Sequence, residues 1–169
     1  KKNMKKLLVL ALVLAPVCAF AQKFGHIDSS SIIQIMPEYT QAQSELETLE
    51  KQYQDELNYL QEELKKKSED YQAQAETLPD NVKQRREQEL NELYEKINKF
   101  YNESDMNLRN TSAQKMQAIT DKIRKAIQEV GDEGSYICIF DSADGMIPYV
   151  STTATTDVTE QVKAKLGIK

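Results

Sequence analysis

Two long stretches of the chain carry apolar residues at alternating intervals of three and four, with polar and charged residues between them. The first stretch runs from about residue 37 to 78, and the second from about residue 82 to 130. No glycine falls between residues 26 and 130, and Pro79 is the only proline between residues 38 and 147. This spacing predicts two long amphipathic helices. The segment Leu78-Pro79-Asp80-Asn81 predicts the turn between them, with the tip near residues 78–82.

The apolar positions of the two stretches predict one shared seam. A fold-back near Pro79 puts Leu60 opposite Phe100, as in an antiparallel hairpin over residues 37–130. Several apolar pairs in the first stretch lie eleven residues apart, which favours a straight or slightly right-handed coil. Polar residues such as Ser104 and Thr111 interrupt the seam, and they are either sites of bending or ordinary seam defects. The expected seam consists of Leu46, Leu49, Tyr53, Leu57, Leu60, Leu64, Tyr71, Ala75 and Leu78, with Leu90, Leu93, Ile97, Phe100, Leu108, Met116, Ile119, Ile123, Ile127 and Val130.

The two ends of the sequence, residues 22–36 and 131–169, predict a small body that contains strands. We expect a strand at 23–28, a short helix through Met36, a buried strand at 135–141, a turn at 142–145 and a returning strand at 146–150. A closing helix at 157–167 follows, capped by Asp157. The fold class is therefore α+β, mostly α. About sixty residues give too little core for one chain, so we expect several bodies to associate through Ile137, Ile139 and Val150.

The first residues have the pattern of a cleavable signal peptide. Four lysines within residues 1–6 precede an apolar run at 7–15, which is too short for a stable membrane anchor. Ala19-Phe20-Ala21 has the small-x-small form of a cleavage site, so the mature chain is expected to begin at Gln22. Cys18 also invites a lipoprotein interpretation, which the bulky Val17 disfavours.

Charge changes when residues 1–21 are removed. From Gln22 onward there are 18 basic and 27 acidic side chains, a net charge near −9. Nucleic acid is therefore not an expected partner, because its binding depends on neutralising phosphates. Cys138 is the only cysteine left, so no disulfide within the chain is expected. A small buried apolar role fits it better than pairing between chains.

Catalytic chemistry finds little support. His26 is the only histidine, and there is no Cys/His cluster, nucleophile motif or glycine-rich phosphate loop. The sequence therefore predicts a protein that is not an enzyme, with no cofactor and no metal. Near the tip, Lys83, Arg85 and Arg86 form a diluted basic patch, for which only a weak membrane or lipopolysaccharide contact is considered.

The second helix is apolar over a wider face than a hairpin needs. Large side chains at Tyr59, Tyr94, Tyr101 and Met106 lie off the expected seam. They are candidates for contact with a partner, and the alternative is packing against the other arm. A protein with this pattern is either a binding protein with weak, dispersed contacts or a structural coiled-coil scaffold of the cell envelope that binds no client.

The chain resembles the Skp (OmpH-like) family of periplasmic chaperones over nearly all of residues 22–169. The resemblance depends on the entry at residues 24–28 and 35–39, the long hairpin, residues 137–141, and the ending around Tyr149 and residues 157–162. It implies a homotrimer whose strands form a central body, with three helical tentacles around a cavity. That cavity would hold unfolded outer-membrane proteins in the periplasm without ATP. Family members are often basic, so the acidity of this chain is a departure that bears on client capture.

Overall fold

The computed structural model describes residues 22–143, 145 and 147–168, so the expected signal peptide lies outside the described residues. As predicted, the fold is mostly α with a small sheet. The described residues form two compact units, the hairpin unit (residues 37–120) and the sheet unit (residues 22–36 and 121–168). The elements in order are β1 (Phe24–Ile27), α2 (Ser29–Ile35), α3 (Pro37–Gln74), α4 (Asp80–Gly134), β2 (Cys138–Asp141), β3 (Thr156–Asp157) and α5 (Thr159–Leu166).

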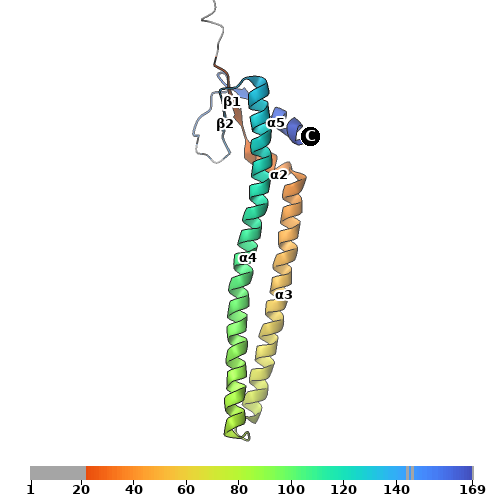
Figure 1. The fold of residues 1–169 in the computed structure, drawn as a ribbon, viewed down its shortest axis with the longest axis vertical. Helices are drawn as coiled ribbons and strands as arrows, with labels where there is room; N and C mark the ends of the chain where they lie inside the picture. The colour runs from red at the N-terminus through yellow and green to blue at the C-terminus, as the bar shows by residue number, and fades with distance from the viewer. Residues whose placement is uncertain (1–21, 144, 146, 169) are drawn as a thin grey trace, which may run out of the picture. The chain divides into compact units, whose positions relative to one another are not determined.

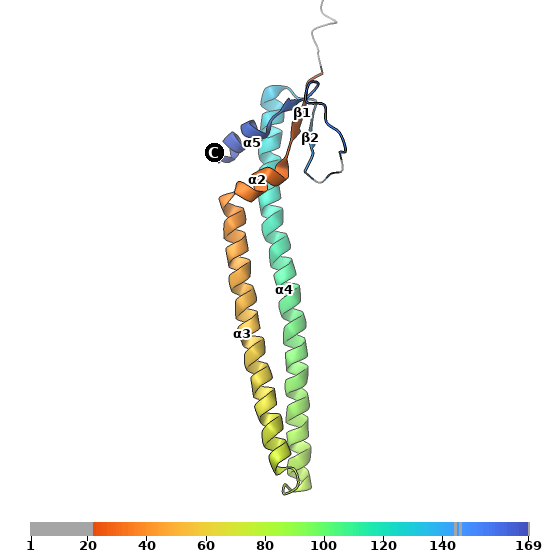
Figure 2. The same ribbon diagram turned by 180° about the vertical axis from the view of Figure 1, so that it is seen from behind.

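In the hairpin unit, α3 and α4 lie side by side and run in opposite directions, as both views show (Figures 1 and 2). The expected seam is confirmed here, since all of its residues between 46 and 119 are buried or half-buried. Leu57, Leu60, Leu93 and Ile97 form the buried centre, with Leu64 and Phe100 packed against it. The Tyr53 and Phe100 rings meet edge to face, 5.9 Å between centroids. The expected pairing of the two stretches therefore holds.

The turn between the helices is placed differently from the expectation. α3 ends at Gln74 rather than near Leu78, and α4 begins at Asp80 rather than Val82. The carbonyl oxygen of Pro79 accepts hydrogen bonds from the N–H groups of Val82 at 2.9 Å and Lys83 at 3.0 Å, so Pro79 acts as the N-cap. Asp80 then lies in the first turn, where a carboxylate is favoured by the helix dipole.

The start of the sheet unit follows the sequence closely. The Asp28 carboxylate caps α2 by accepting from the N–H groups of Ser30 at 3.1 Å and Ser31 at 3.2 Å. The hydroxyl and backbone of Ser30, with those of Ser31, hold the pKa of Asp28 below its usual value by stabilising the charged form. Met36 ends α2 in an extended conformation, as expected for the residue that precedes a proline. Pro37 then occupies the first position of α3, where its missing N–H costs nothing.

The sheet has the order β2-β1-β3, and both pairings are parallel. Phe24 is opposite Cys138 in one pairing, and His26 is opposite Asp157 in the other. The expected returning strand at 146–150 is wrong, because residues 147–150 are not a strand and Met146 lies outside the described residues. A physical reason lies in Pro148, which has no N–H to donate to a ladder beside β2. The later segment β3 pairs with the other edge of β1 instead.

The end of α4 also departs from the prediction. The helix continues through Gly131 to Gly134 instead of ending at Val130, because a glycine costs a helix only about 1 kcal/mol. Ser135 takes the left-handed conformation with φ 53°. Its N–H bonds the Asp132 carbonyl, and the Tyr136 N–H bonds the Gly131 carbonyl at 3.0 Å. These two bonds are a Schellman ending with serine where glycine is usual.

The closing helix is confirmed, with a different cap. α5 runs from Thr159 to Leu166, and Val158 is its N-cap residue, which makes no side-chain bond. Asp157 lies one residue earlier and accepts hydrogen bonds from the Thr159 hydroxyl at 2.6 Å and the Thr159 N–H at 2.9 Å. Both bonds favour the charged carboxylate and lower its pKa. α5 packs against α2, and the fully buried side chains of this unit are Ile27, Ile32, Met36, Val158 and Val162.

Candidate functional site

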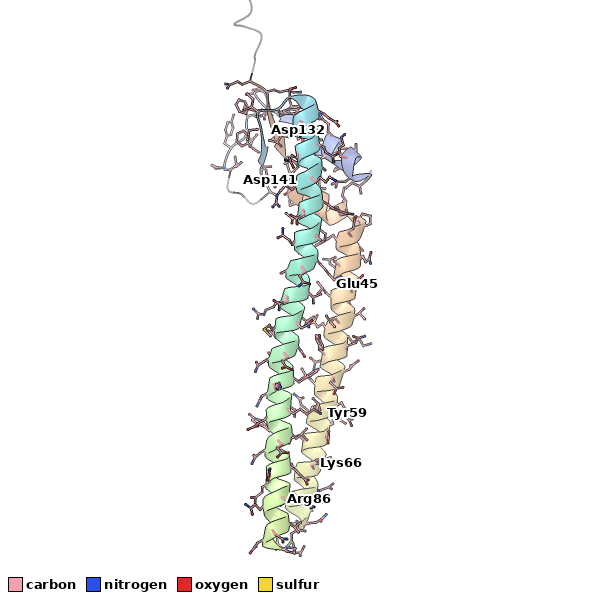
Figure 3. The ribbon with its side chains drawn as sticks, in the orientation of Figure 1. Glu45, Tyr59, Lys66, Arg86, Asp132 and Asp141 are labelled. Atoms are coloured by element: carbon pink, nitrogen blue, oxygen red, sulfur yellow. The ribbon has the colours of Figure 1, made fainter. Side chains whose placement is uncertain are left out.

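The four side chains expected off the seam are exposed. Tyr59 on α3 is 65% exposed, and Tyr94, Tyr101 and Met106 on α4 are 59%, 60% and 60% exposed. They therefore do not pack between the two helices of this chain. Most large apolar side chains of the hairpin are at least half-buried, so these four are the surface on which a partner could gain contact area. Figure 3 labels Tyr59 among the side chains of α3.

The structure does not gather these four residues into one patch. Tyr94 and Tyr101 are seven residues apart and lie on the same side of α4. Met106 lies about 140° further round the helix than Tyr101, at about 100° per residue. Tyr59 lies about 100° round α3 from the buried Leu60. The candidate contacts are thus dispersed over several faces of the hairpin, with one pair at two-turn spacing.

Two polar contacts join the arms on either side of the apolar centre. Toward the tip, the Tyr71 hydroxyl donates to the Glu87 carboxylate at 2.6 Å, and this bond raises the pKa of Tyr71. At the other end of the hairpin unit, the Lys115 ammonium donates to the Glu45 carboxylate, and this bond is the main reason that the pKa of Glu45 is lowered. Both pairs are largely solvated and contribute little stability. Both are consistent with the register that the apolar seam sets between α3 and α4.

A groove opens in the seam beside the Glu45–Lys115 pair. It measures about 390 Å³ and exists because small and polar residues occupy the seam where a bulky layer would close it. The sequence predicts Thr111 to interrupt the seam, as a site of bending or an ordinary defect, and it does not predict an open groove. The residues that line the groove are Ser44, Glu45, Thr48, Leu49 and Gln52 from α3, with Thr111 and Lys115 from α4.

The basic residues near the tip are largely engaged by one carboxylate. Arg85 Nε lies 3.5 Å from one oxygen of Glu89, and Arg86 Nη1 lies 3.3 Å from the other. Lys83 is half-buried. The patch therefore presents less free positive charge than its sequence suggests. A weak membrane or lipopolysaccharide contact here stays a prediction.

The residues expected to associate chains lie on or near β2. Ile137 is 61% exposed, whereas Ile139 and Val150 are half-buried. Ile139 packs against Gly25: a Cβ added at Gly25 would lie 3.1 Å from Cγ1 of Ile139. Cys138 is half-buried rather than buried. The expectation of a buried strand is therefore wrong for a single chain. β2 is an edge strand that pairs with β1 on one side only, and none of its residues is fully buried.

Two exposed aromatic side chains, one on β2 and one in the segment after it, were not predicted from the sequence. Phe140 stacks on Phe24 at 6.1 Å between centroids and is 36% exposed, and Tyr149 is 78% exposed. Strand alternation could have flagged Phe140, because it is two residues from Cys138 and one from Ile139. No sequence signal marks Tyr149 as exposed. Together with Ile137, Phe140 makes the neighbourhood of β2 apolar.

His26 has a structural partner rather than a catalytic one. Its Nδ1 lies 2.9 Å from the Thr155 hydroxyl oxygen. That hydroxyl donates to the Ser151 carbonyl at 2.6 Å, so Nδ1 carries the proton and donates to Thr155. The contact ties the segment before β3 to β1. Among residues 22–143, 145 and 147–168 there is no group of three side chains suited to hold a metal ion.

The chain combines a small parallel sheet of three short strands with a long antiparallel helical hairpin. It therefore belongs to the class of proteins in which a helical hairpin is joined to a small sheet. The OmpH family, described as outer membrane protein (OmpH-like), matches residues 23–166. The chain belongs to this family, which confirms the resemblance inferred from the sequence. Chaperones of this family are periplasmic and in general not enzymes.

A solved structure from Caulobacter crescentus CB15 has the same fold. It is provisionally described as an outer membrane chaperone (OmpH-like). The TM-score is 0.72 at 14% sequence identity, over 86% of this chain and 83% of that chain. No match is found among curated protein sequences. Within the described part of the chain, no helix combines the length and the apolar character needed to cross a membrane.

Proposed function

We propose that this protein is an ATP-independent holdase chaperone of the periplasm, which binds unfolded outer-membrane proteins and prevents their aggregation. It would be exported by residues 1–21 and act as a homotrimer, with clients held between the helical hairpins. One observation carries the proposal. The hairpin buries its own seam and still presents Tyr59, Tyr94, Tyr101 and Met106 to solvent.

Dispersed contacts suit a holdase physically. A partly exposed tyrosine that becomes buried gives on the order of 1 kcal/mol, at about 25 cal/mol per Å² of apolar area. Several such contacts hold an unfolded chain, and each breaks easily when the client is released. Adaptable surfaces of this kind bind many sequences without one tight pocket. Membership of the OmpH-like family supports the same conclusion.

The test is an aggregation assay with an unfolded outer-membrane barrel protein. The variant replaces all four exposed residues with serine: Tyr59→Ser, Tyr94→Ser, Tyr101→Ser and Met106→Ser. A matched control replaces four exposed polar residues of the same helices: Gln61→Ser, Gln84→Ser, Asn98→Ser and Asn110→Ser. We expect the parent and the control to keep the client soluble and the four-site variant to lose holding while it remains helical. Each single replacement should weaken holding only slightly.

A parent protein that leaves the barrel to aggregate would refute the chaperone function and leave the envelope scaffold as the better interpretation. A folded four-site variant that holds the client as well as the parent would refute only the assignment of the contact residues. Salt gives a further check. Holding should depend on ionic strength less steeply than in a strongly basic relative, because this chain lacks long-range attraction for acidic clients.

A further inference from the structure

The groove of the hairpin unit continues into a line of α3 side chains that points toward the tip. Successive members are three or four residues apart, so they share one face of the helix. All of them except Glu63 are exposed. We call this line the α3 stripe, and it consists of Glu45, Thr48, Gln52, Glu56, Tyr59 and Glu63.

The part of α3 that carries the stripe is strongly acidic. Residues 37–64 contain eight acidic side chains and one basic side chain, Lys51. On the other wall of the groove, residues 110–114 of α4 are uncharged, and the ammonium of Lys115 is already bound to Glu45. Within residues 37–64, the carboxylates that make no ion pair with any described residue are Glu47, Glu50, Asp55, Glu56 and Glu62.

The groove is large enough for a bulky side chain. Its volume of about 390 Å³ falls within the range of ordinary ligand pockets, and the half-buried Leu49 lines it. The side chains of Thr48 and Gln52 are exposed at the same place and can bond an extended backbone. Further along the stripe, the exposed Tyr59 ring offers a face to a cation.

We propose that the groove and the α3 stripe bind an extended, positively charged segment of an unfolded polypeptide. One apolar side chain of the segment enters the groove, and neighbouring lysine or arginine side chains lie along Glu56 and Tyr59. Charge complementarity decides this occupant, because an acidic segment would face unpaired carboxylates of the same sign. The inference rests on the proposed function and adds to it the part of the client that is bound: the acidic stripe of α3 would bind basic stretches of the unfolded client.

The proposal is tested with the mature chain and two labelled peptides. In one peptide, leucines alternate with lysines between serine-glycine spacers, and in the other, glutamate replaces every lysine. Fluorescence anisotropy measures the affinity of each peptide at low and high salt. We expect the lysine peptide to bind about tenfold more tightly at low salt, with the preference shrinking as salt screens the charges. Equal affinities for the two peptides at low salt would overturn the proposal.

Matched variants locate the site. The first variant, Asp55→Asn with Glu56→Gln and Glu62→Gln, removes three unpaired carboxylates beside the stripe. The control, Glu69→Gln with Glu76→Gln and Glu95→Gln, removes the same charge elsewhere on the hairpin. We expect the first to lose most of the lysine preference, by about tenfold, and the control to keep it. A control that loses as much as the first variant would show a general charge effect and contradict the assigned site.

A third variant tests the groove itself. Thr48→Phe fills the groove with the protein's own side chain, and we expect weaker binding of the lysine peptide, with circular dichroism unchanged. Unchanged binding by the folded variant would remove the groove from the site. The aggregation assay on the same proteins separates the two proposals. A parent that holds the barrel but does not distinguish the peptides keeps its chaperone function and refutes the charged site. A parent that distinguishes the peptides but does not hold the barrel protein keeps the charged site and refutes the chaperone function.

Discussion

Gly134 is the glycine at which an added side chain would have the least room. A Cβ at this position would lie 2.3 Å from Cε2 of Tyr136, far inside van der Waals contact. The Lys23 ammonium lies 4.0 Å from the centroid of the Tyr136 ring, and a shift of the ring would disturb this cation–π contact. The same ammonium donates to the Gly134 carbonyl at 3.1 Å. The absence of a side chain at Gly134 therefore leaves room for the Tyr136 ring, just after α4, to contact the Lys23 ammonium, just before β1.

We expect Gly134→Ala to lower the stability of the sheet unit by about 1–3 kcal/mol, because the added methyl group displaces the Tyr136 ring. Thermal unfolding of the mature protein measures the change. Gly131→Ala is the control, since a Cβ there meets its nearest neighbour at an ordinary 3.6 Å. That variant should be neutral or slightly stabilising, because alanine favours a helix. Equal destabilisation by the two substitutions would show that Tyr136 is not the cause.

At the scale of elements, the sequence predicted what depends on local pattern and missed what depends on pairing. The hairpin seam follows from apolar spacing, so Leu60 and Ile97 are buried as expected. The ends of the helices differ because a proline carbonyl can begin a helix and a glycine can be tolerated inside one. The returning strand at 146–150 was wrongly predicted, since an apolar pattern does not say which segment pairs with which strand, and β3 at Thr156–Asp157 pairs with β1 instead. The groove at Thr48 and Thr111 was missed because polarity in a seam marks weak packing but not its shape.

Local stability should differ along the hairpin. We expect amide hydrogen exchange to be fastest around residues 78–86, where the turn is solvated, and intermediate near Ser104 and Thr111. It should be slowest around residues 123–130 and in the strands, since Ile123 and Val130 are each only 3% exposed. Exchange followed by mass spectrometry on the mature protein measures this gradient. Uniform protection from residue 40 to 130 would contradict it.

At the scale of the whole molecule, the neighbourhood of β2 is the surface that a single chain leaves apolar. In the described sheet β2 is an edge strand, and Ile137, just before it, and Phe140, on it, are exposed. Natural sheets usually cover or charge such edges, because exposed ones pair with other chains. Association through this edge would cover it, and it agrees with the proposed homotrimer.

Ile137→Asp separates association from folding of the chain. Ile137 is 61% exposed in the single chain, so a carboxylate there is tolerated by the chain itself. In an assembly that buries this position, the unpaired charge is costly. We expect the variant to sediment as a folded monomer at concentrations where the parent is a trimer. A parent that sediments as a stable folded monomer, or a variant that remains trimeric, would exclude this interface.

The parallel pairing of β1 with β2 affects the order in which parts of the chain fold. The Ser142 hydroxyl and N–H bond the Ile27 carbonyl across 115 positions of sequence, whereas Tyr71 and Glu87 meet across only 16. Closing the longer loop costs more entropy, and non-local contacts form more slowly. The first strand of the emerging chain must therefore wait, unpaired, until nearly all of the sequence has followed it. In pulse-labelled refolding we expect amides beside the turn to gain protection before those of residues 24–27, and simultaneous protection would show that the two units fold together.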